Sequence, residues 1–104
     1  MENYFVNVKA NKNCQIEIKD DVDLILKLFS LTKSKEGTNE LKITFETTSG
    51  KSGFIGFLDE KSGSYQIVTN LRFTGGDTVT FMVVGSGELY ISGCLLNCNE
   101  LANN

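Results

Sequence analysis

The sequence predicts an all-β fold, a sandwich or a barrel, and three observations support this prediction. Turn-forming residues recur at short intervals along the 104-residue chain. The segments between them are short and rich in Val, Ile, Phe, Tyr and Thr, which favour strands. Several of these segments alternate between apolar and polar residues, as a strand with one buried face does. A chain of this length is typical of a single domain.

The clearest alternation is at residues 41–47, where Leu41, Ile43 and Phe45 share one face and polar side chains share the other. Residues 14–19 alternate in the same way and predict a second strand. Residues 65–73 predict a third strand. Within it we expect four side chains on the inner face: Tyr65, Ile67, Leu71 and Phe73.

Three further segments, at residues 22–31, 78–84 and 88–96, carry apolar side chains on both faces. The first of them also fits a helix capped by Asp20 or Asp21, but the all-β surroundings favour a strand. Strands that are apolar on both faces are covered on both faces. In so small a domain the second cover is either another subunit or a loop or terminus of the same chain. The side chains that we expect at a subunit interface are Phe29, Leu31, Met82, Val84, Tyr90 and Cys94.

The composition excludes several function classes. The chain has no histidine, so Ser-His-Asp and Cys-His catalysis and histidine-containing zinc sites are excluded. Its net charge of -3 argues against nucleic acid and anionic lipid as direct partners and is compatible with a basic protein. No apolar run reaches the roughly 18 residues of a membrane span, and no secretory signal is evident. We expect its 3 cysteines to be reduced thiols, because their spacing is not that of a disulfide framework.

No group of residues predicts an enzyme, a metal site or a cofactor site. Asp20, Asp21 and Asp23 lack the glycine and the spaced glutamate of a calcium loop, which leaves a solvated turn or a contact with a basic protein. Ser86 has no neighbouring base that could activate it. The turn at residues 75–77 has neither the lysine nor the following helix of a phosphate loop.

Residues 77–93 resemble the end of the nucleoplasmin family core. The family has a Val-x-Phe strand, then Gly-Ser-Gly, an apolar-aromatic-apolar triplet and Ser-Gly, and residues 85–87, 89–91 and 92–93 match these. We expect a hairpin here, with Gly85 and Gly87 at positive φ in its tight turn. Gly93 is expected where a strand bends or another backbone approaches.

Residues 71–77 resemble the nucleoplasmin-like domain that precedes FK506-binding-type prolyl isomerases in insects, fungi and plants. The chain also departs from the family pattern. Its first strand, at residues 4–7, has neither the Trp nor the Gly of the family, and the loop at residues 32–37 is basic where nucleoplasmins are acidic. No acidic tract follows Leu96. These differences bear more on histone affinity than on the fold.

The resemblance implies an eight-stranded jelly-roll β-sandwich. We expect a nucleoplasmin-like core at residues 1–96 and a polar, frayed tail at 97–104. The expected strands are at residues 4–9, 14–19, 22–32, 41–48, 53–58, 64–73, 78–84 and 88–96.

The same resemblance implies a nuclear or nucleolar histone chaperone that forms a homo-pentamer, alone or stacked into a decamer. Its implied partners are the H2 pair of histones (types A and B), the H3–H4 pair, or both. The acidic residues that we expect to contact histones are Asp20, Asp21, Glu36, Glu40, Asp59 and Glu60. The alternative is an oligomerisation module of a larger chromatin protein, such as a prolyl isomerase of this type, with the partner-binding parts elsewhere.

Overall fold

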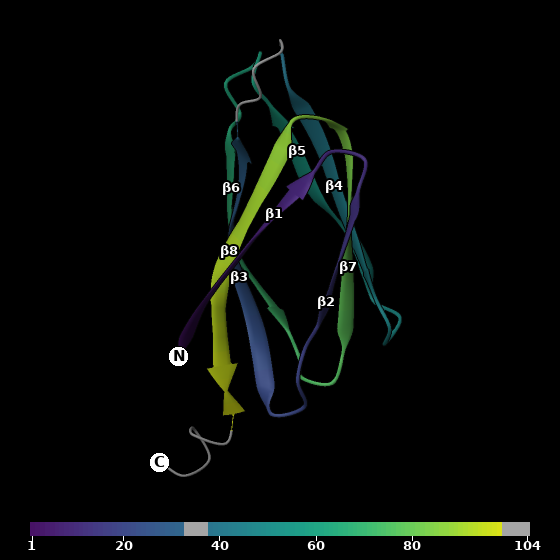
Figure 1. The fold of residues 1–104 in the computed structure, drawn as a ribbon, viewed down its shortest axis with the longest axis vertical. Helices are drawn as coiled ribbons and strands as arrows, with labels where there is room; N and C mark the ends of the chain where they lie inside the picture. Colours follow the sequence, from purple (N-terminus) through teal and green to yellow (C-terminus); the bar gives the residue numbers. More distant parts are fainter. Residues whose placement is uncertain (33–37, 99–104) are drawn as a thin grey trace.

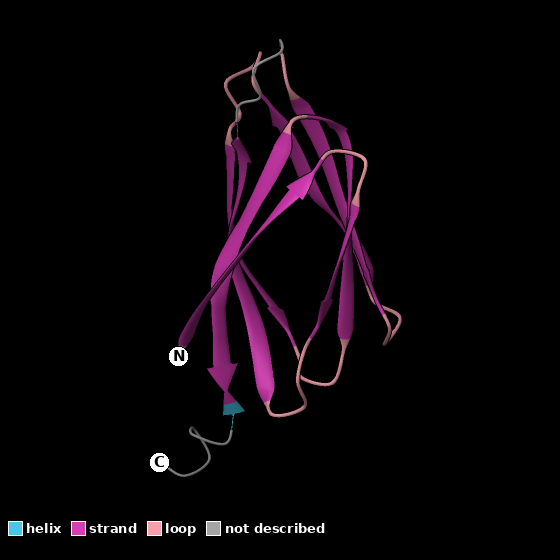
Figure 2. Ribbon diagram, in the orientation of Figure 1, coloured by secondary structure: helices cyan, strands magenta, loops and turns pink. Residues whose placement is uncertain are grey.

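The computed structural model describes residues 1–32 and 38–98, and its eight named elements are all strands (Figures 1 and 2). Only Cys98, the last described residue, is assigned as helix, which Figure 2 draws in cyan after β8. All eight expected strands are present, and each end lies within two residues of its expected position. The ambiguous segment after Asp21 is a strand. The strands are β1 (Glu2–Lys9), β2 (Asn13–Glu17), β3 (Val22–Thr32), β4 (Glu40–Thr47), β5 (Ser52–Asp59), β6 (Gln66–Phe73), β7 (Thr78–Ser86) and β8 (Glu88–Asn97).

The strands form two antiparallel four-stranded sheets that pack face to face. The first sheet has the order β1-β8-β3-β6, and the second has the order β2-β7-β4-β5. Among these eight strands, only β4 and β5 are joined as a hairpin within one sheet, whereas every other pair of consecutive strands is divided between the two sheets. This crossing pattern is that of a jelly roll. Within the described ranges, no helix is long and apolar enough to cross a membrane.

The core is built from the inward-facing residues of both sheets. Phe29 of the first sheet meets Phe81 of the second edge to face, with ring centroids 5.7 Å apart. Phe73 and Phe45 extend this aromatic cluster. Such edge-to-face pairs add to the free energy gained from burying the rings.

A β-bulge in β3 explains why this strand looked apolar on both faces. Leu26 and Leu28 pair with the adjacent residues Gly93 and Ser92 of β8, so Lys27 is the extra residue. An extra residue reverses which side chains point inward. Leu24 and Leu26 before the bulge, and Phe29 and Leu31 after it, therefore all face the core.

The expected hairpin between β7 and β8 is wrong, because these two strands belong to different sheets. The segment from Gly85 to Gly87 is a sharp corner at which the chain leaves one sheet and enters the other. Both glycines have the positive φ that was expected, +136° and +108°. A Cβ on Gly85 would lie 2.0 Å from the carbonyl oxygen of Glu40, so this position requires glycine for space as well as for backbone conformation.

Gly93 allows the close approach that was expected of it. A Cβ there would lie 2.0 Å from the carbonyl oxygen of Ile25 in the neighbouring strand β3.

Two other expectations need correction. Tyr65 precedes β6 and is exposed rather than inward, with its hydroxyl donating to the carbonyl of Glu60 at 3.3 Å. Strand β8 continues to Asn97, one residue into the expected tail, and residues 99–104 lie outside the described part of the chain.

Candidate functional site

The acidic residues proposed to contact a basic partner lie at the two opposite ends of the sandwich (Figure 1). Asp20 and Asp21 are in the turn between β2 and β3, at the lower end in this view. Glu40 begins β4 and Asp59 ends β5, at the upper end. Glu36 lies outside the described residues. The structure therefore divides the expected site into two separate acidic groups.

At the upper end, Glu40 and Asp59 lie directly opposite each other in the β4–β5 pair. Like charges in this arrangement repel, and a bound cation would relieve the repulsion. Asp59 Oδ1 accepts a hydrogen bond from the backbone N–H of Lys61 at 3.0 Å, which fixes the side chain in its turn. Glu40 is exposed. These two carboxylates form the acidic group at the upper end.

Glu60 has a structural role. Its Oε2 accepts hydrogen bonds from the backbone N–H of Asn39 at 3.0 Å and from Asn39 Nδ2 at 3.1 Å. Asn39 is buried, and its side chain is the group that a Cβ on Gly87 would meet. Because Glu60 satisfies a buried polar residue beneath the β7–β8 corner, changing its charge would disturb the fold as well as the surface.

At the lower end, glycine holds the turn that carries Asp20 and Asp21. A Cβ on Gly75 would lie 2.3 Å from the carbonyl oxygen of Asp20 and 2.5 Å from that of Val22, so the β6–β7 turn packs directly on the β2–β3 turn. The N–H of Gly76 donates to the carbonyl of Ile18 at 2.9 Å. The two exposed carboxylates therefore stand on a rigid support.

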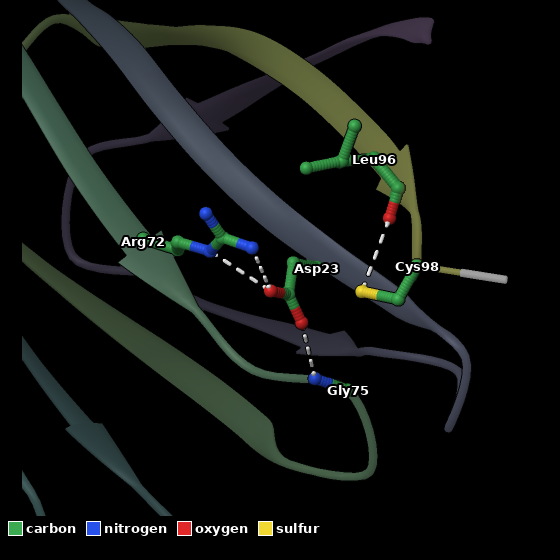
Figure 3. A network of polar contacts seen from close by, with 5 residues as sticks. All are labelled: Asp23, Arg72, Gly75, Leu96 and Cys98. Atoms are coloured by element: carbon green, nitrogen blue, oxygen red, sulfur yellow. Dashed lines mark hydrogen bonds and ion pairs between the residues drawn. The ribbon is translucent and has the colours of Figure 1, made fainter. Parts of the chain in front are cut away.

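Figure 3 shows an ion pair beside this turn that the sequence did not reveal. Nε and Nη2 of Arg72 donate to Oδ2 of Asp23 at 2.8 and 2.6 Å, and the N–H of Gly75 donates to Oδ1 at 3.1 Å. The hydrogen bond from Arg72 is the main cause that lowers the pKa of Asp23. Cys98 lies alongside, with Sγ 3.9 Å from the carbonyl of Leu96. Asp23 is thus occupied within the fold and does not extend the exposed acidic group.

Asp77 joins two turns at the same end. Its Oδ2 accepts from Ser49 Oγ at 2.6 Å, and its Oδ1 accepts from Thr48 Oγ1 at 2.7 Å and from two backbone N–H groups. These hydrogen bonds, led by that of Ser49, lower the pKa of Asp77 to about 2. Asp77 is therefore a structural carboxylate that ties the β4–β5 turn to the start of β7.

The candidate interface residues divide into two classes. Phe29 and Leu31 are buried in the core of the single chain, so their assignment to a subunit interface is wrong. The assignment failed because the bulge at Lys27 turns these two side chains inward, and the sequence pattern does not reveal the bulge. Met82 and Val84 lie on the outer face of the second sheet. Their pairing in register with β4 residues that also face outward establishes this.

Tyr90 and Cys94 lie on the outer face of the first sheet, because they alternate with the buried Leu89 and Ile91 of β8. Tyr90 packs beside Phe5, with ring centroids 6.2 Å apart. On the strands, the sequence reasoning missed four exposed apolar side chains: Phe5, Phe54, Phe57 and Val68.

Phe54 and Phe57 are three residues apart, yet both face outward. Ile43 and Thr44 of β4 pair with Gly56 and Phe54, so Ile55 is the extra residue of a bulge in β5. The two rings pack against each other, with their centroids 5.0 Å apart. Gly56, inside this short apolar segment, could have indicated the bulge from the sequence, since a glycine within a strand often marks one.

A groove of about 380 Å³ lies where the edge strands β1 and β2 separate, and its lining includes Tyr4, Ile16 and Leu95. Burial is the main cause that raises the pKa of Tyr4, and burial also raises that of nearby Cys14. Both groups are therefore held in their neutral forms, which are poor nucleophiles.

All 3 cysteines are free thiols. In the described part of the chain, no three His, Cys, Asp or Glu side chains are grouped so as to hold a metal ion.

Taken together, these features describe a jelly-roll sandwich with apolar patches on its outer sheet faces and carboxylates at its two ends. A sequence model of the nucleoplasmin-like domain matches residues 4–96. The chain therefore belongs to the nucleoplasmin-like domain family, as the resemblance of its last strands implied.

Two solved structures support this assignment of the fold. The Drosophila NLP-core, whose structure bears on pentamer formation and histone binding, shares 19% sequence identity at a TM-score of 0.78, covering 92% of this chain and 99% of its own. The nucleoplasmin-like N-terminal domain of Drosophila FKBP39 shares 16% identity at a TM-score of 0.68, covering 92% of this chain and 88% of its own. A search of curated proteins found no match.

Proposed function

We propose that this domain is the core of a nuclear histone chaperone that assembles as a pentameric ring and binds histone pairs through its exposed carboxylates. The observation that carries the proposal is membership of the nucleoplasmin-like family, together with a fold like that of the Drosophila NLP-core. The mechanism is non-catalytic. A ring repeats each weak acidic contact five times, and a multivalent basic partner then binds far more tightly than any single contact allows.

Electrostatics limits how strongly the domain binds. One chain has a net charge of -3, and a ring of five carries five times this charge, which attracts a basic partner at low salt. At roughly 0.15 M salt the Debye length is about 8 Å, so dispersed carboxylates are screened and only neighbouring ones act together. Of the described candidates, Glu40 with Asp59 and Asp20 with Asp21 are such neighbours.

The test is a titration of the domain, in graded salt, with each of the two core histone pairs in turn. We expect weak binding that fades as the salt rises. Glu40→Lys with Asp59→Lys tests the upper end, and Asp20→Lys with Asp21→Lys tests the lower end. Whichever pair carries the contact weakens binding on reversal, while Lys12→Glu, a change of the opposite sign in an exposed turn, should not weaken it.

The second candidate is an oligomerisation module of a larger chromatin protein. The structure provides a reason to keep it, since Glu60 and Asp23 are committed to internal hydrogen bonds and the remaining acidic residues are split between two ends. If neither histone pair binds at low salt while the ring still forms, the module is the correct function.

A further inference from the structure

Strand β1 has a long, regular edge that no other described strand covers. Among the eight strands it pairs only with β8, in a register without a shift. The pairings of the edge strands β5 and β6 contain bulges, and the edge strand β2 has only 5 residues. β1 has no proline, and its one lysine, Lys9, is its last residue. Proteins usually protect an edge with such features, because a bare edge accepts a further strand.

The free edge of β1 presents the backbone groups of alternate residues. The N–H of Ala10 donates to the carbonyl of Gly87 at 3.0 Å, which continues the register of β1 with β8. Hydrogen-bonded and non-hydrogen-bonded pairs alternate along an antiparallel ladder, so the odd-numbered residues of β1 are in its non-hydrogen-bonded pairs. The backbone N–H and C=O groups of Asn3, Phe5 and Asn7 therefore point away from β8.

Beside this edge lies the groove of about 380 Å³ between β1 and β2. The two strands are joined by the turn at residues 10–12 and diverge toward the lower end of the sandwich (Figure 1). Tyr4, Ile16 and Leu95 pack against the core and form the apolar floor of the groove. A strand added to β1 directs every second side chain into this groove. Backbone partners at an edge and a pocket for alternate side chains are the two parts that strand addition uses.

Acidic residues surround the lower end of the groove. Glu2 and Glu17 line it, with Lys19 as the opposing charge. The turn that follows Lys19 carries the exposed Asp20 and Asp21. This end therefore attracts basic residues.

The other end of the same edge is basic. Lys9 ends β1 and Lys12 follows in the turn, and both are exposed. A strand added antiparallel to β1, as β8 is, ends beside the carboxylates of the lower end. A segment with basic residues at its C-terminal end is therefore attracted, whereas the reverse order places its positive charges beside the two lysines.

We propose that an extended segment of a basic protein partner binds along β1 as an additional strand of the sheet β1-β8-β3-β6. Its alternate apolar side chains fill the groove, and basic residues at its C-terminal end meet Glu2, Glu17 and the turn at residues 20–21. Backbone hydrogen bonds give the affinity, and the two kinds of side chain give the specificity. The inference rests on the proposed function for the class of partner and assigns that partner a site at the sheet edge.

The probe is a synthetic peptide, Ser-Val-Thr-Val-Thr-Lys-Arg, with fluorescein at its N-terminus and an amide at its C-terminus. Its valines are placed for the groove, and its threonines present their backbone groups to β1. Fluorescence anisotropy at low salt should show saturable binding. The reversed peptide, Arg-Lys-Thr-Val-Thr-Val-Ser, has the same composition and should bind roughly fivefold more weakly. Methyl groups on the backbone nitrogens of both threonines should weaken binding by at least as much, because they block strand addition.

Two variants of the protein test the edge and its acidic end. Asn7→Pro removes an N–H from the free edge and leaves the ladder to β8 in place, and Asn7→Ala, which keeps the N–H, is its control. Glu17→Lys is matched by Glu46→Lys, since both side chains are exposed on the outer face of the same sheet and Glu46 is outside the groove. We expect Asn7→Pro and Glu17→Lys each to bind the peptide roughly fivefold more weakly, and both controls to match the parent. Circular dichroism checks the fold of all four.

Three results with the peptide overturn the inference. The parent does not bind it, or Asn7→Pro and Glu17→Lys bind it as the parent does, or the reversed and methylated peptides bind equally well. The last result would mean that the attraction is electrostatic and needs no added strand.

Titration of the same variants with the histone pairs separates the inference from the proposed function. If a histone pair binds the parent and loses affinity in Asn7→Pro and Glu17→Lys, the inference is supported. If it binds the parent and both variants equally, the inference fails and the proposed function stands. If the parent binds the peptide and neither histone pair, the proposed function fails and the groove is a site for another basic partner.

Discussion

The side chain of Asn11 holds both backbone groups of Gly85. Nδ2 of Asn11 donates to the carbonyl of Gly85 at 2.9 Å, and the N–H of Gly85 donates to Oδ1 of Asn11 at 3.2 Å. Asn11 lies in the β1–β2 turn at a φ of +66°, a conformation that asparagine tolerates better than most residues. The turn is thereby fastened to the corner at which the chain changes sheets.

Replacing Asn11 should destabilise the fold. Asn11→Ala removes both hydrogen bonds and puts an alanine at positive φ, and we expect a loss of about 1–3 kcal/mol in the free energy of unfolding. Asn11→Gly removes the same hydrogen bonds but relieves the backbone, so it should cost less. Urea denaturation measures both. Equal stability of Asn11→Ala and the parent would contradict a fastening role.

Gly85 should be the least replaceable glycine of the corner. Gly85→Ala brings a Cβ to within 2.0 Å of a backbone oxygen, whereas Gly87→Ala meets only a side chain at 3.0 Å. Gly50→Ala is the control, because Gly50 also has a positive φ, +92°, with nothing within 4 Å of its Cβ position. We expect Gly50→Ala to cost about 1 kcal/mol from backbone strain alone, and Gly85→Ala clearly more. If thermal melting places the two variants together, steric contact at the corner is not limiting.

The sequence predicted the strands well because their signals are local. Alternation along β2 and β4 and the glycines of the corner depend only on neighbouring residues. The prediction of inward and outward side chains failed where one inserted residue reverses the face on which the following side chains lie, as at Lys27 and Ile55. The bulge at Lys27 cannot be recognised from the local sequence, because β3 has apolar residues at both its odd and its even positions. Which side chains of β3 face the core is decided by packing against the other sheet, which the local sequence does not show.

The same limit applies to the acidic residues. Exposed carboxylates in turns are recognisable in the sequence, but which of them are used internally depends on contacts between distant segments. Glu60 meets Asn39 and Asp23 meets Arg72 across 21 and 49 residues, and no spacing rule connects them. The assignment of β7 and β8 to different sheets is hidden for the same reason.

Acid should weaken the fold partly through Asp77. Its pKa is lowered in the folded state to about 2 from an ordinary 3.8, so its stabilising effect is complete above about pH 4 and is lost as the pH falls through 2. Asp77→Asn should therefore melt lower than the parent at neutral pH, and the gap should close as the pH approaches 2. Asp21→Asn, with an exposed side chain, controls for the lost charge. A gap that is the same at pH 7 and pH 2 would show that the charge of Asp77 plays no part.

The thiols should make no contribution through disulfide bonds. Cys14, Cys94 and Cys98 are all free in the structure. Adding a reducing agent should leave the melting temperature unchanged, and thiol titration of the denatured chain should detect all 3 cysteines. A fall of several degrees on reduction would reveal a structural disulfide and would contradict the expectation that all three cysteines are reduced thiols.

Asp23 should matter more to stability than its partner Arg72. The Asp23 side chain is 11% exposed and that of Arg72 is 53% exposed, so much of the ion pair is screened by water. Asp23→Ala also leaves the N–H of Gly75 without its acceptor, and we expect a cost of about 1–3 kcal/mol. Asp23→Asn can keep an oxygen toward Gly75 and should retain part of the stability.

A double-mutant cycle separates these two contributions. Arg72→Ala alone should destabilise less than Asp23→Ala, because it removes the ion pair and leaves the bond to Gly75 in place. The combined variant should be little worse than Asp23→Ala, since the first change has already removed what Arg72 binds. Full additivity in urea denaturation would mean that the two side chains do not interact in solution. If Arg72→Ala were the more damaging variant, leaving the nearly buried Asp23 carboxylate without a charged partner would cost more than losing its bond to Gly75.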